Sequence, residues 1–195
     1  MRIPLNLTVV EPFTNDQLYE FCIANKELRI ERDAHGQLFI MSPTGTETSF
    51  YNYDIGFELG IWNRKHKLGR ISESNGGYLL PDGSMRAPDI AWISHERLKE
   101  VDPKDAKGFM KICPDFVIEL MSPNDSLQEA DKKMDNWLSN GVRLGWLIDP
   151  QNRLTYVCLP SETRHEISFT QVLSGGEVLP EFELDLQEIF GEKVS

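Results

Sequence analysis

Two acidic residues stand in segments that otherwise have the pattern of buried strands. The segment PDFVIELMS (residues 114–122) is almost entirely apolar, which is typical of a strand covered on both faces. Side chains alternate faces along a strand, so Val117, Glu119 and Met121 share one face. A buried carboxylate without a partner is costly, and Glu119 therefore requires a cation, a metal ion or a shifted pKa.

The segment RAPDIAWIS (residues 86–94) carries a second acid in a similar position. Asp89 follows Pro88 and precedes the apolar run of residues 90–93. If the two strands are neighbours, the two carboxylates come together and repel each other unless one keeps its proton or a divalent cation lies between them. Hard oxygen ligands completed by water suit Mg²⁺ or Mn²⁺ better than Zn²⁺. The pair predicts a metal site with Asp89 and Glu119 as its ligands.

A cationic partner for Glu119 must come from outside its strand, because methionine stands two residues further on the same face. The helix predicted from a Ser126 cap to about Ser139 supplies two lysines. At about 100° per residue, its inward-facing stripe comprises Leu127, Ala130, Met134, Trp137 and Leu138. Lys133 borders this stripe, whereas Lys132 points away from it. We expect Lys133 to lie along the seam between helix and sheet, with its ammonium group near Glu119.

The chain resembles the Uma2 (DUF820) family of endonucleases, which are members of the PD-(D/E)xK restriction-endonuclease-like superfamily. Three segments carry the resemblance in the same order: RAPDIAWIS, PDFVIELMSPNDS and DKKMDNWLSNGVRLGWLIDP. The resemblance runs from about residue 31 to residue 159 and includes ERDAHGQLFIMSPTG. It implies that Asp89 is the motif aspartate, Glu119 the motif glutamate, and Lys133 the motif lysine moved to the following helix.

Two further positions bear on that resemblance. Glu31 matches an acidic position near the site of the family, and the alternative is an exposed residue paired with an arginine of its own hairpin. The family pattern leads us to expect a histidine at the start of a long helix, where this chain has Thr48. If that histidine assists metal or phosphate binding, this binding is weakened or altered in the present chain. Glu47 and Glu58 lie nearby on the same helix and could compensate in part.

The overall charge argues against a simple nucleic-acid-binding protein. The 195 residues carry a formal net charge of -11, whereas proteins that grip the phosphate backbone usually present a basic patch. One basic concentration does occur, formed by Arg64, Lys65, His66, Lys67 and Arg70. We favour solvated side chains that complement the negative end of a helix over a basic groove.

The chain has none of the sequence features of a membrane or exported protein. No apolar run approaches the roughly 20 residues needed to cross a bilayer, and the N-terminal segment lacks the pattern of a signal peptide. Cys22, Cys113 and Cys158 are odd in number and far apart, which is typical of reduced thiols. We therefore expect a cytoplasmic protein without a membrane segment.

The remaining patterns predict an α+β fold with a central mixed sheet flanked by helices, in one domain spanning residues 1–195. An N-terminal helix from a Thr14 cap to about Asn25 precedes a hairpin over residues 27–42. A long helix follows from Thr46 to about residue 67, and Gly69 is expected to end it. One face of this helix carries Phe50, Tyr53, Phe57 and Ile61.

Weaker patterns fill the rest of the chain. The charged loop over residues 100–113 is expected to be exposed and mobile. The other expected elements are strands over residues 69–74 and 76–80, a hairpin over residues 142–160, a strand near residues 166–170, a turn at Gly175–Gly176 and a short closing helix. The resemblance adds that the sheet is the core of a restriction-endonuclease-like fold.

These observations lead to the hypothesis of metal-dependent hydrolysis of DNA phosphodiester bonds. Asp89, Glu119 and the Leu120 carbonyl would hold the metal, and Lys133 would orient the nucleophile and offset charge on the phosphate. Cutting both strands of a duplex needs two sites, so this hypothesis favours a homodimer. One alternative, supported by the acidic charge and Thr48, is a nuclease-like fold that no longer cleaves and serves as a binding or assembly module. A purely structural Glu119–Lys133 salt bridge is a weaker alternative, because apolar residues often replace such pairs without loss of stability.

Overall fold

The computed structural model describes residues 2–5, 13–103 and 108–191 of the chain. Its helices are α1 (Asn15–Ala24), α2 (Thr46–His66), α3 (His95–Leu98), α4 (Leu127–Ser139) and α5 (Leu186–Phe190). Its strands are β1 (Arg2–Pro4), β2 (Arg29–Arg32), β3 (Leu38–Met41), β4 (Gly69–Glu73), β5 (Tyr78–Leu79), β6 (Met85–Arg86), β7 (Ile90–Ser94), β8 (Phe116–Leu120), β9 (Leu144–Asp149), β10 (Leu154–Cys158), β11 (His165–Ser168), β12 (Leu173–Ser174) and β13 (Glu183–Leu184). Among the described helices, none is long and apolar enough to cross a membrane.

A six-stranded mixed sheet forms the centre of the molecule, in the order β11-β10-β9-β8-β7-β4. β8 and β9 are parallel, and the other neighbours are antiparallel. The parallel pair is joined through α4, because two parallel strands need a crossover connection. The predicted hairpin over residues 142–160 is the β9–β10 pair, and the α+β class with a mixed sheet is confirmed.

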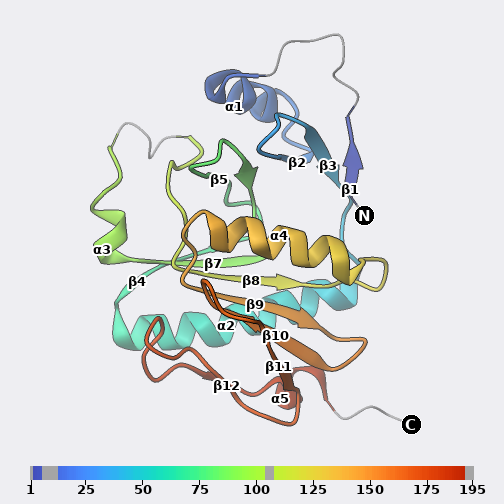
Figure 1. The fold of residues 1–195 in the computed structure, drawn as a ribbon, viewed down its shortest axis with the longest axis vertical. Helices are drawn as coiled ribbons and strands as arrows, with labels where there is room; N and C mark the ends of the chain where they lie inside the picture. Colours follow the sequence, from blue (N-terminus) through green and yellow to red (C-terminus); the bar gives the residue numbers. More distant parts are fainter. Residues whose placement is uncertain (1, 6–12, 104–107, 192–195) are drawn as a thin grey trace.

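Helices cover both faces of this sheet, with α4 in front of it and α2 behind it (Figure 1). Phe116, Ile118 and Leu120 of β8 pack on the α2 side, whereas Val117 and Met121 pack on the α4 side. The alternation predicted for residues 114–122 is therefore correct, and it assigns Glu119 to the α4 side. All five residues of β8 are buried.

A second, five-stranded sheet lies beside the first and carries the N-terminal hairpin, in the order β1-β3-β2-β6-β5. α1 covers this sheet through Leu18, which is fully buried against Ile30 and Leu38. The Thr14 hydroxyl accepts a hydrogen bond from the backbone of Gln17, whose side chain in turn caps Thr14. This capping box explains why the predicted start of the helix is correct.

The segment RAPDIAWIS is not one strand, contrary to expectation. Arg86 belongs to β6 of the five-stranded sheet, and Ile90 begins β7 of the six-stranded sheet. Pro88 lies between them and has no N–H to donate to a ladder, so the strand is interrupted there. Asp89 therefore lies where the chain passes from one sheet to the other.

The exposure of α2 differs from what its apolar stripe suggests. Its buried face consists of Thr48, Ile55, Leu59 and Trp62. The stripe named from the sequence points outward, and its four side chains, Phe50, Tyr53, Phe57 and Ile61, are exposed. The helix has the expected bounds within one residue, but it is stopped at Lys67, which adopts the left-handed conformation (φ 55°), and not at Gly69, which begins β4.

The loop over residues 100–113 is less exposed than expected. Residues 104–107 lie outside the described part of the chain, but Ile112 and Cys113 are buried in the core on the α4 side. The ring of Phe109 packs edge-on against Tyr19 of α1, with 5.3 Å between centroids. This end of the loop therefore connects the two sheets.

The C-terminal segment covers the α2 side of the central sheet. The strand expected near residues 166–170 is β11, and Gly176 in the predicted turn has a positive φ of 56°. Phe182 and Leu184 join the same core as Trp62, and α5 closes the segment.

Candidate active site

The strand register brings Asp89 next to the end of β8. Ile90 pairs with Ile118 in the antiparallel ladder, so Asp89 lies beside Glu119 and Leu120. One oxygen of the Asp89 carboxylate accepts a hydrogen bond from the Leu120 N–H at 2.9 Å. The two acids named from the sequence are thus brought together at the edge of two adjacent strands.

The lysine of α4 reaches this pair as expected. Lys133 Nζ lies 2.9 Å from one oxygen of Glu119, and its side chain is 18% exposed. The other oxygen of Glu119 accepts a hydrogen bond of 2.8 Å from the indole N–H of Trp137, one turn further along α4. Lys132 is exposed to solvent. Both oxygens of the buried Glu119 carboxylate therefore have donors from α4.

Glu31 is a buried member of the same cluster. Its side chain is 2% exposed and lies 3.0 Å from Lys133 Nζ and 3.1 Å from Arg86 Nη1. The alternative, an exposed residue paired with Arg29 or Arg32 of the same hairpin, is wrong. Lys133 is thereby held between Glu31 of one sheet and Glu119 of the other.

Three residues of the cluster were not predicted from the sequence. Arg86 is buried, contacts Glu31, and donates through Nε to Asn136 of α4 at 2.9 Å. Trp137 had been assigned to the core alone, although its indole N–H requires an acceptor when buried. Arg29 lines the pocket and shares a face of β2 with Glu31. The alternation of side chains along a strand could have indicated this from the sequence.

Burial dominates the electrostatics of the site. It raises the pKa of Glu119 to about 7, with Lys133 opposing the shift and Asp89 and Glu31 adding to it. Burial also raises the pKa of Asp89, against the charge of Lys133 and the hydrogen bond from Leu120. The surrounding carboxylates outweigh burial at Lys133 and raise its pKa. The three carboxylates of the cluster, Asp89, Glu119 and Glu31, are matched in number by three cations, Lys133, Arg86 and Arg29.

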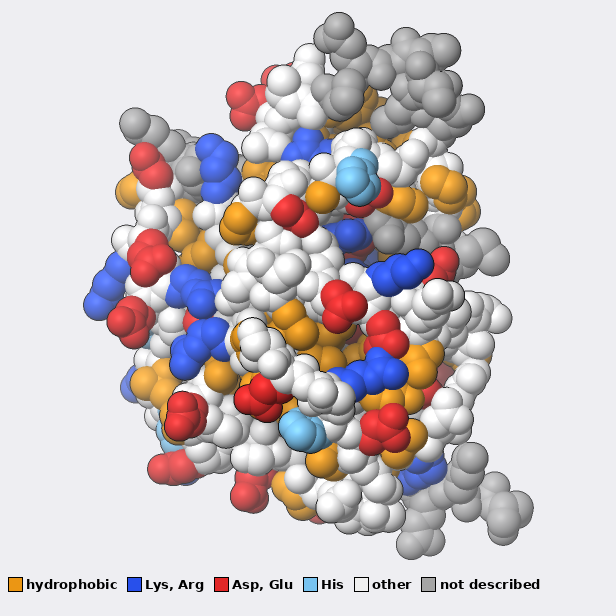
Figure 2. Space-filling model, viewed as in Figure 1, with side chains coloured by type: hydrophobic (Ala, Val, Ile, Leu, Met, Phe, Trp, Pro, Cys, Tyr) orange, Lys and Arg blue, Asp and Glu red, His pale blue; other side chains and the backbone are white. Residues whose placement is uncertain are grey.

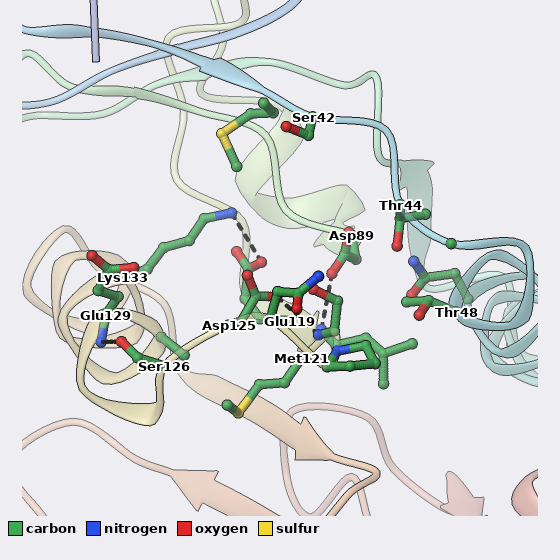
Figure 3. Close-up of a pocket in the computed structure, with 18 of the residues that line it drawn as sticks. Ser42, Thr44, Thr48, Asp89, Glu119, Met121, Asp125, Ser126, Glu129 and Lys133 are labelled. Carbon is green, nitrogen blue, oxygen red and sulfur yellow. Dashed lines mark hydrogen bonds and ion pairs between the residues drawn. The ribbon is translucent and has the colours of Figure 1, made fainter. Parts of the chain in front are cut away.

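A pocket of about 470 Å³ opens over this cluster (Figure 3). Figure 3 shows Glu129 and Ser126 on the α4 side of the pocket and Thr44 and Thr48 on the opposite side, beside α2. Asp89 and Glu119 lie between these walls, and Lys133 extends toward them from α4. The site is therefore accessible from solvent through polar walls.

The donor set of the pocket fits a hard divalent cation. In the described part of the chain there is no group of three or more His, Cys, Asp or Glu side chains that could hold a metal, so Asp89 and Glu119 would need further oxygen ligands. The N–H and C=O of one residue point to the same edge of a strand, and the Leu120 N–H points to Asp89. The Leu120 carbonyl thus faces the same edge. Two carboxylates, a carbonyl and water are ligands that suit Mg²⁺ and Mn²⁺.

The residues expected to compensate for the missing histidine do not reach the pocket. Thr48 lines it from the first turn of α2, in the place where the histidine was expected. Glu47 is exposed, and its carboxylate accepts a hydrogen bond from the Tyr51 hydroxyl. Glu58 lies further along α2, at a separate hollow. Neither glutamate replaces a ligand at the pocket.

The basic concentration near residues 64–70 also lies away from the site. Arg64, Lys65 and His66 occupy the last turn of α2, whereas the pocket lies at its first turn. At 1.5 Å per residue the 21 residues of α2 separate the two by about 30 Å. Over the face shown in Figure 2, basic and acidic side chains are interspersed. Complementing the helix end, as favoured from the sequence, agrees with this placement.

Most of the chain matches a known protein family. A family model described as "Uma2: Putative restriction endonuclease" matches residues 15–187. The chain belongs to the Uma2 family. The Uma2 match is longer than the segment over residues 31–159 that carried the resemblance, and it takes in α1 and the start of α5.

The fold of this Uma2 chain is also similar to a solved structure. The crystal structure of a "putative nuclease belonging to DUF820" from Anabaena variabilis is 20% identical to it, with a TM-score of 0.74. The similarity covers 92% of this chain and 98% of the other. At this identity the likeness shows the common fold. No curated protein matches the chain.

Proposed function

We propose that this chain is an endonuclease that hydrolyses DNA phosphodiester bonds with Mg²⁺ or Mn²⁺ at a PD-(D/E)xK-type site. The observation that carries the proposal is the buried carboxylate of Glu119, beside Asp89 and 2.9 Å from Lys133 Nζ. Membership of the Uma2 family supports nuclease activity in general terms. The solved relative of similar fold, described as a putative nuclease, supports the same class.

The side chains of the cluster have distinct roles in this proposal. Asp89 and Glu119 bind the divalent ion, which when bound supplies a Lewis acid that lowers the pKa of water and offsets charge on the phosphate. Lys133 places a fixed positive charge next to the reacting phosphate and stabilises the negative charge that develops there. Glu31 is a positioning residue, because its contact with Lys133 holds the ammonium group at the seam.

Arg29 is the second cationic residue of the pocket, and we assign it to the substrate phosphate. Its Nη2 donates to the Ser74 carbonyl at 3.0 Å, whereas its buried Nε has no hydrogen-bond partner among the described residues. The positive charge of Arg29 at the pocket would attract a phosphate group. This local contact would allow DNA to bind although the chain is acidic overall. A second copy of the chain would make the second cut of a duplex.

The cysteines support a proposal for the compartment. Cys22, Cys113 and Cys158 are all free thiols, and the last two are buried. Free thiols support a reducing compartment, and we place the protein in the cytoplasm.

Plasmid cleavage tests the proposal. Supercoiled DNA is incubated with the protein and Mg²⁺ or Mn²⁺, and nicked and linear products are measured on a gel. We expect Glu119→Gln to abolish cleavage and Lys133→Ala to lower its rate. Matched controls on the outer face of α4, Asp135→Asn and Lys132→Ala, should cleave like the wild type. A wild-type protein that cuts no DNA with either metal, or controls that lose as much activity as the site variants, would contradict the proposal.

One observation favours a second candidate function. Thr48 stands at the pocket where the family pattern leads us to expect a histidine, which suits a nuclease-like fold that binds without cutting. Calorimetric titration with Mg²⁺ and Mn²⁺ separates the two functions, because a site that has lost its chemistry binds neither ion. Metal binding abolished by Glu119→Gln favours the nuclease.

A further inference from the structure

The outer face of α2 carries a stripe of large apolar side chains. Phe50, Tyr53, Phe57 and Ile61 are 63%, 70%, 52% and 48% exposed, and nothing in the described part of the chain covers them. The rings of Tyr53 and Phe57 stack on each other with 6.2 Å between centroids. The opposite face of the same helix packs on the central sheet through Ile55, Leu59 and Trp62. Contiguous exposed apolar side chains of this size mark interaction surfaces.

Gly60 borders this stripe, three residues after Phe57, and no packing contact among the described residues requires a glycine there. A Cβ atom built at this position meets nothing within 4 Å, so an alanine would fit without strain. Glycine in a helix interior costs about 1 kcal/mol relative to alanine. A residue without a side chain does allow another backbone to approach the helix closely. Gly60 therefore points to a partner helix on this face.

We propose that the outer face of α2 binds the same face of a second copy of this chain, with the two helices antiparallel across a two-fold axis near Phe57. In a two-fold interface the same surface is used on both copies, so it must be complementary to itself. The apolar stripe is continuous through the position of the axis, because Tyr53 and Ile61 lie one turn to either side of Phe57.

The charges along α2 favour this orientation. Glu47 lies in its first turn, Asp54 and Glu58 lie on either side of Phe57 near its middle, and its last turn and C-cap carry the basic residues Arg64, Lys65, His66 and Lys67. With Phe57 at the axis, Glu47 of one helix lies level with Lys67 of its partner, and Phe50 lies level with Arg64. A parallel arrangement would place like charges side by side along the whole helix, which is unfavourable, whereas the antiparallel one does so only near the axis, at Asp54 and Glu58.

The exposed area is sufficient for a weak to moderate dimer. At ~200 Å² for a large side chain, the exposed fractions correspond to about 450 Å² on each copy, or about 900 Å² for the pair. Stable interfaces begin at about 1,200 Å², so the stripe by itself corresponds to the weak end of specific interfaces. Val172, which is 52% exposed, lies with Phe57 at a neighbouring hollow whose lining also includes five acidic residues.

The proposed dimer leaves both active-site pockets open. Each pocket lies at the first turn of α2, next to Gly45 and Thr48, whereas the axis passes near the middle of the helix. Gly45 is about 18 Å from Phe57 along the helix at 1.5 Å per residue, so the two pockets lie at opposite ends of the helix pair. The interface does not involve the residues of the site, and the inference stands independently of nuclease activity.

Light scattering coupled to size-exclusion chromatography measures the mass directly. The wild-type protein should have twice the chain mass of 22.4 kDa at micromolar concentrations. Phe57→Glu places two negative charges opposite each other at the axis and should weaken dimerisation on the order of 100-fold or more, giving the monomer mass. The matched control is Ile23→Glu on α1, where an equally exposed apolar residue lies away from the stripe, and this variant should stay dimeric.

Two further variants separate interface from folding and from the site. Circular dichroism checks that Phe57→Glu is folded, and Tyr53→Ser at the most exposed position of the stripe gives a second, milder test. Glu119→Gln should remain dimeric whatever its effect on cleavage. A monomeric wild type at every concentration, as expected if a different protein covers α2, would overturn the inference. Equal dimerisation of the Phe57→Glu and Ile23→Glu proteins would overturn it as well.

Discussion

Replacing Lys133 by methionine removes the ammonium group that joins the two sheets while keeping the length and apolar character of the side chain. In the structure this group lies 2.9 Å from Glu119 and 3.0 Å from Glu31. Glu31 keeps Arg86 as a partner after the substitution, whereas Glu119 keeps the neutral indole of Trp137. The substitution therefore leaves an uncompensated carboxylate at Glu119.

The expected cost depends on pH. Removing one partner of a buried ion pair costs about 3–5 kcal/mol when the remaining group is charged. The pKa of Glu119 in the folded wild type is about 7, and the loss of Lys133 raises it further, because the lysine opposes the shift. A carboxyl whose folded pKa is above its unfolded value contributes stability that is present at low pH and lost as pH rises through the folded pKa. Lys133→Met should therefore be much more destabilising above pH 7 than below it.

Urea unfolding followed by tryptophan fluorescence measures this difference. The free energy of unfolding is determined about two units below and two units above the Glu119 pKa of about 7. Lys132→Met, one residue away and exposed, is the control and should cost little at either pH. The reasoning is refuted if Lys133→Met costs the same at both pH values, or no more than the control.

Two further predictions concern Glu119 directly. Affinity for Mg²⁺, measured by calorimetry, should rise about tenfold per pH unit below the Glu119 pKa of about 7 and level off above it, because the metal displaces a proton from the carboxyl group. A flat profile would show that Glu119 does not bind the ion. Trp137→Phe removes the N–H that donates to Glu119, so it should lower the free energy of unfolding by about 1–3 kcal/mol. The midpoint of the pH profile of Mg²⁺ affinity should also move to higher pH. An unchanged midpoint would contradict the role of the indole.

The fold could be predicted where a local signal acts alone. The alternation in residues 114–122 correctly gave the two faces of β8, and the Thr14 cap gave the start of α1. The break at Pro88 and the separate second sheet depend on which strands pair over long distances, which a single sequence does not contain. On α2 the spacing of apolar residues is helical on two faces, and only the packing of Trp62 against the sheet selects the buried one.

The candidate site was predictable to a similar extent. Helical geometry distinguished Lys133 from Lys132, because the stripe of α4 is strongly one-sided. The partner of Glu31 was not predictable, since Arg86 approaches it from a strand 55 positions later in the sequence. The failure of Glu58 to reach the pocket follows from its distance along α2 and its turn away from the sheet.

A crystal of the wild-type protein soaked in Mn²⁺ tests the central claim most directly. Anomalous diffraction locates the ion independently of any assay of cleavage. The account predicts an anomalous peak between the carboxylates of Asp89 and Glu119, within reach of the Leu120 carbonyl, and its loss in Glu119→Gln crystals. A fully soaked crystal with no peak at these carboxylates, or with the ion bound elsewhere, would contradict the account.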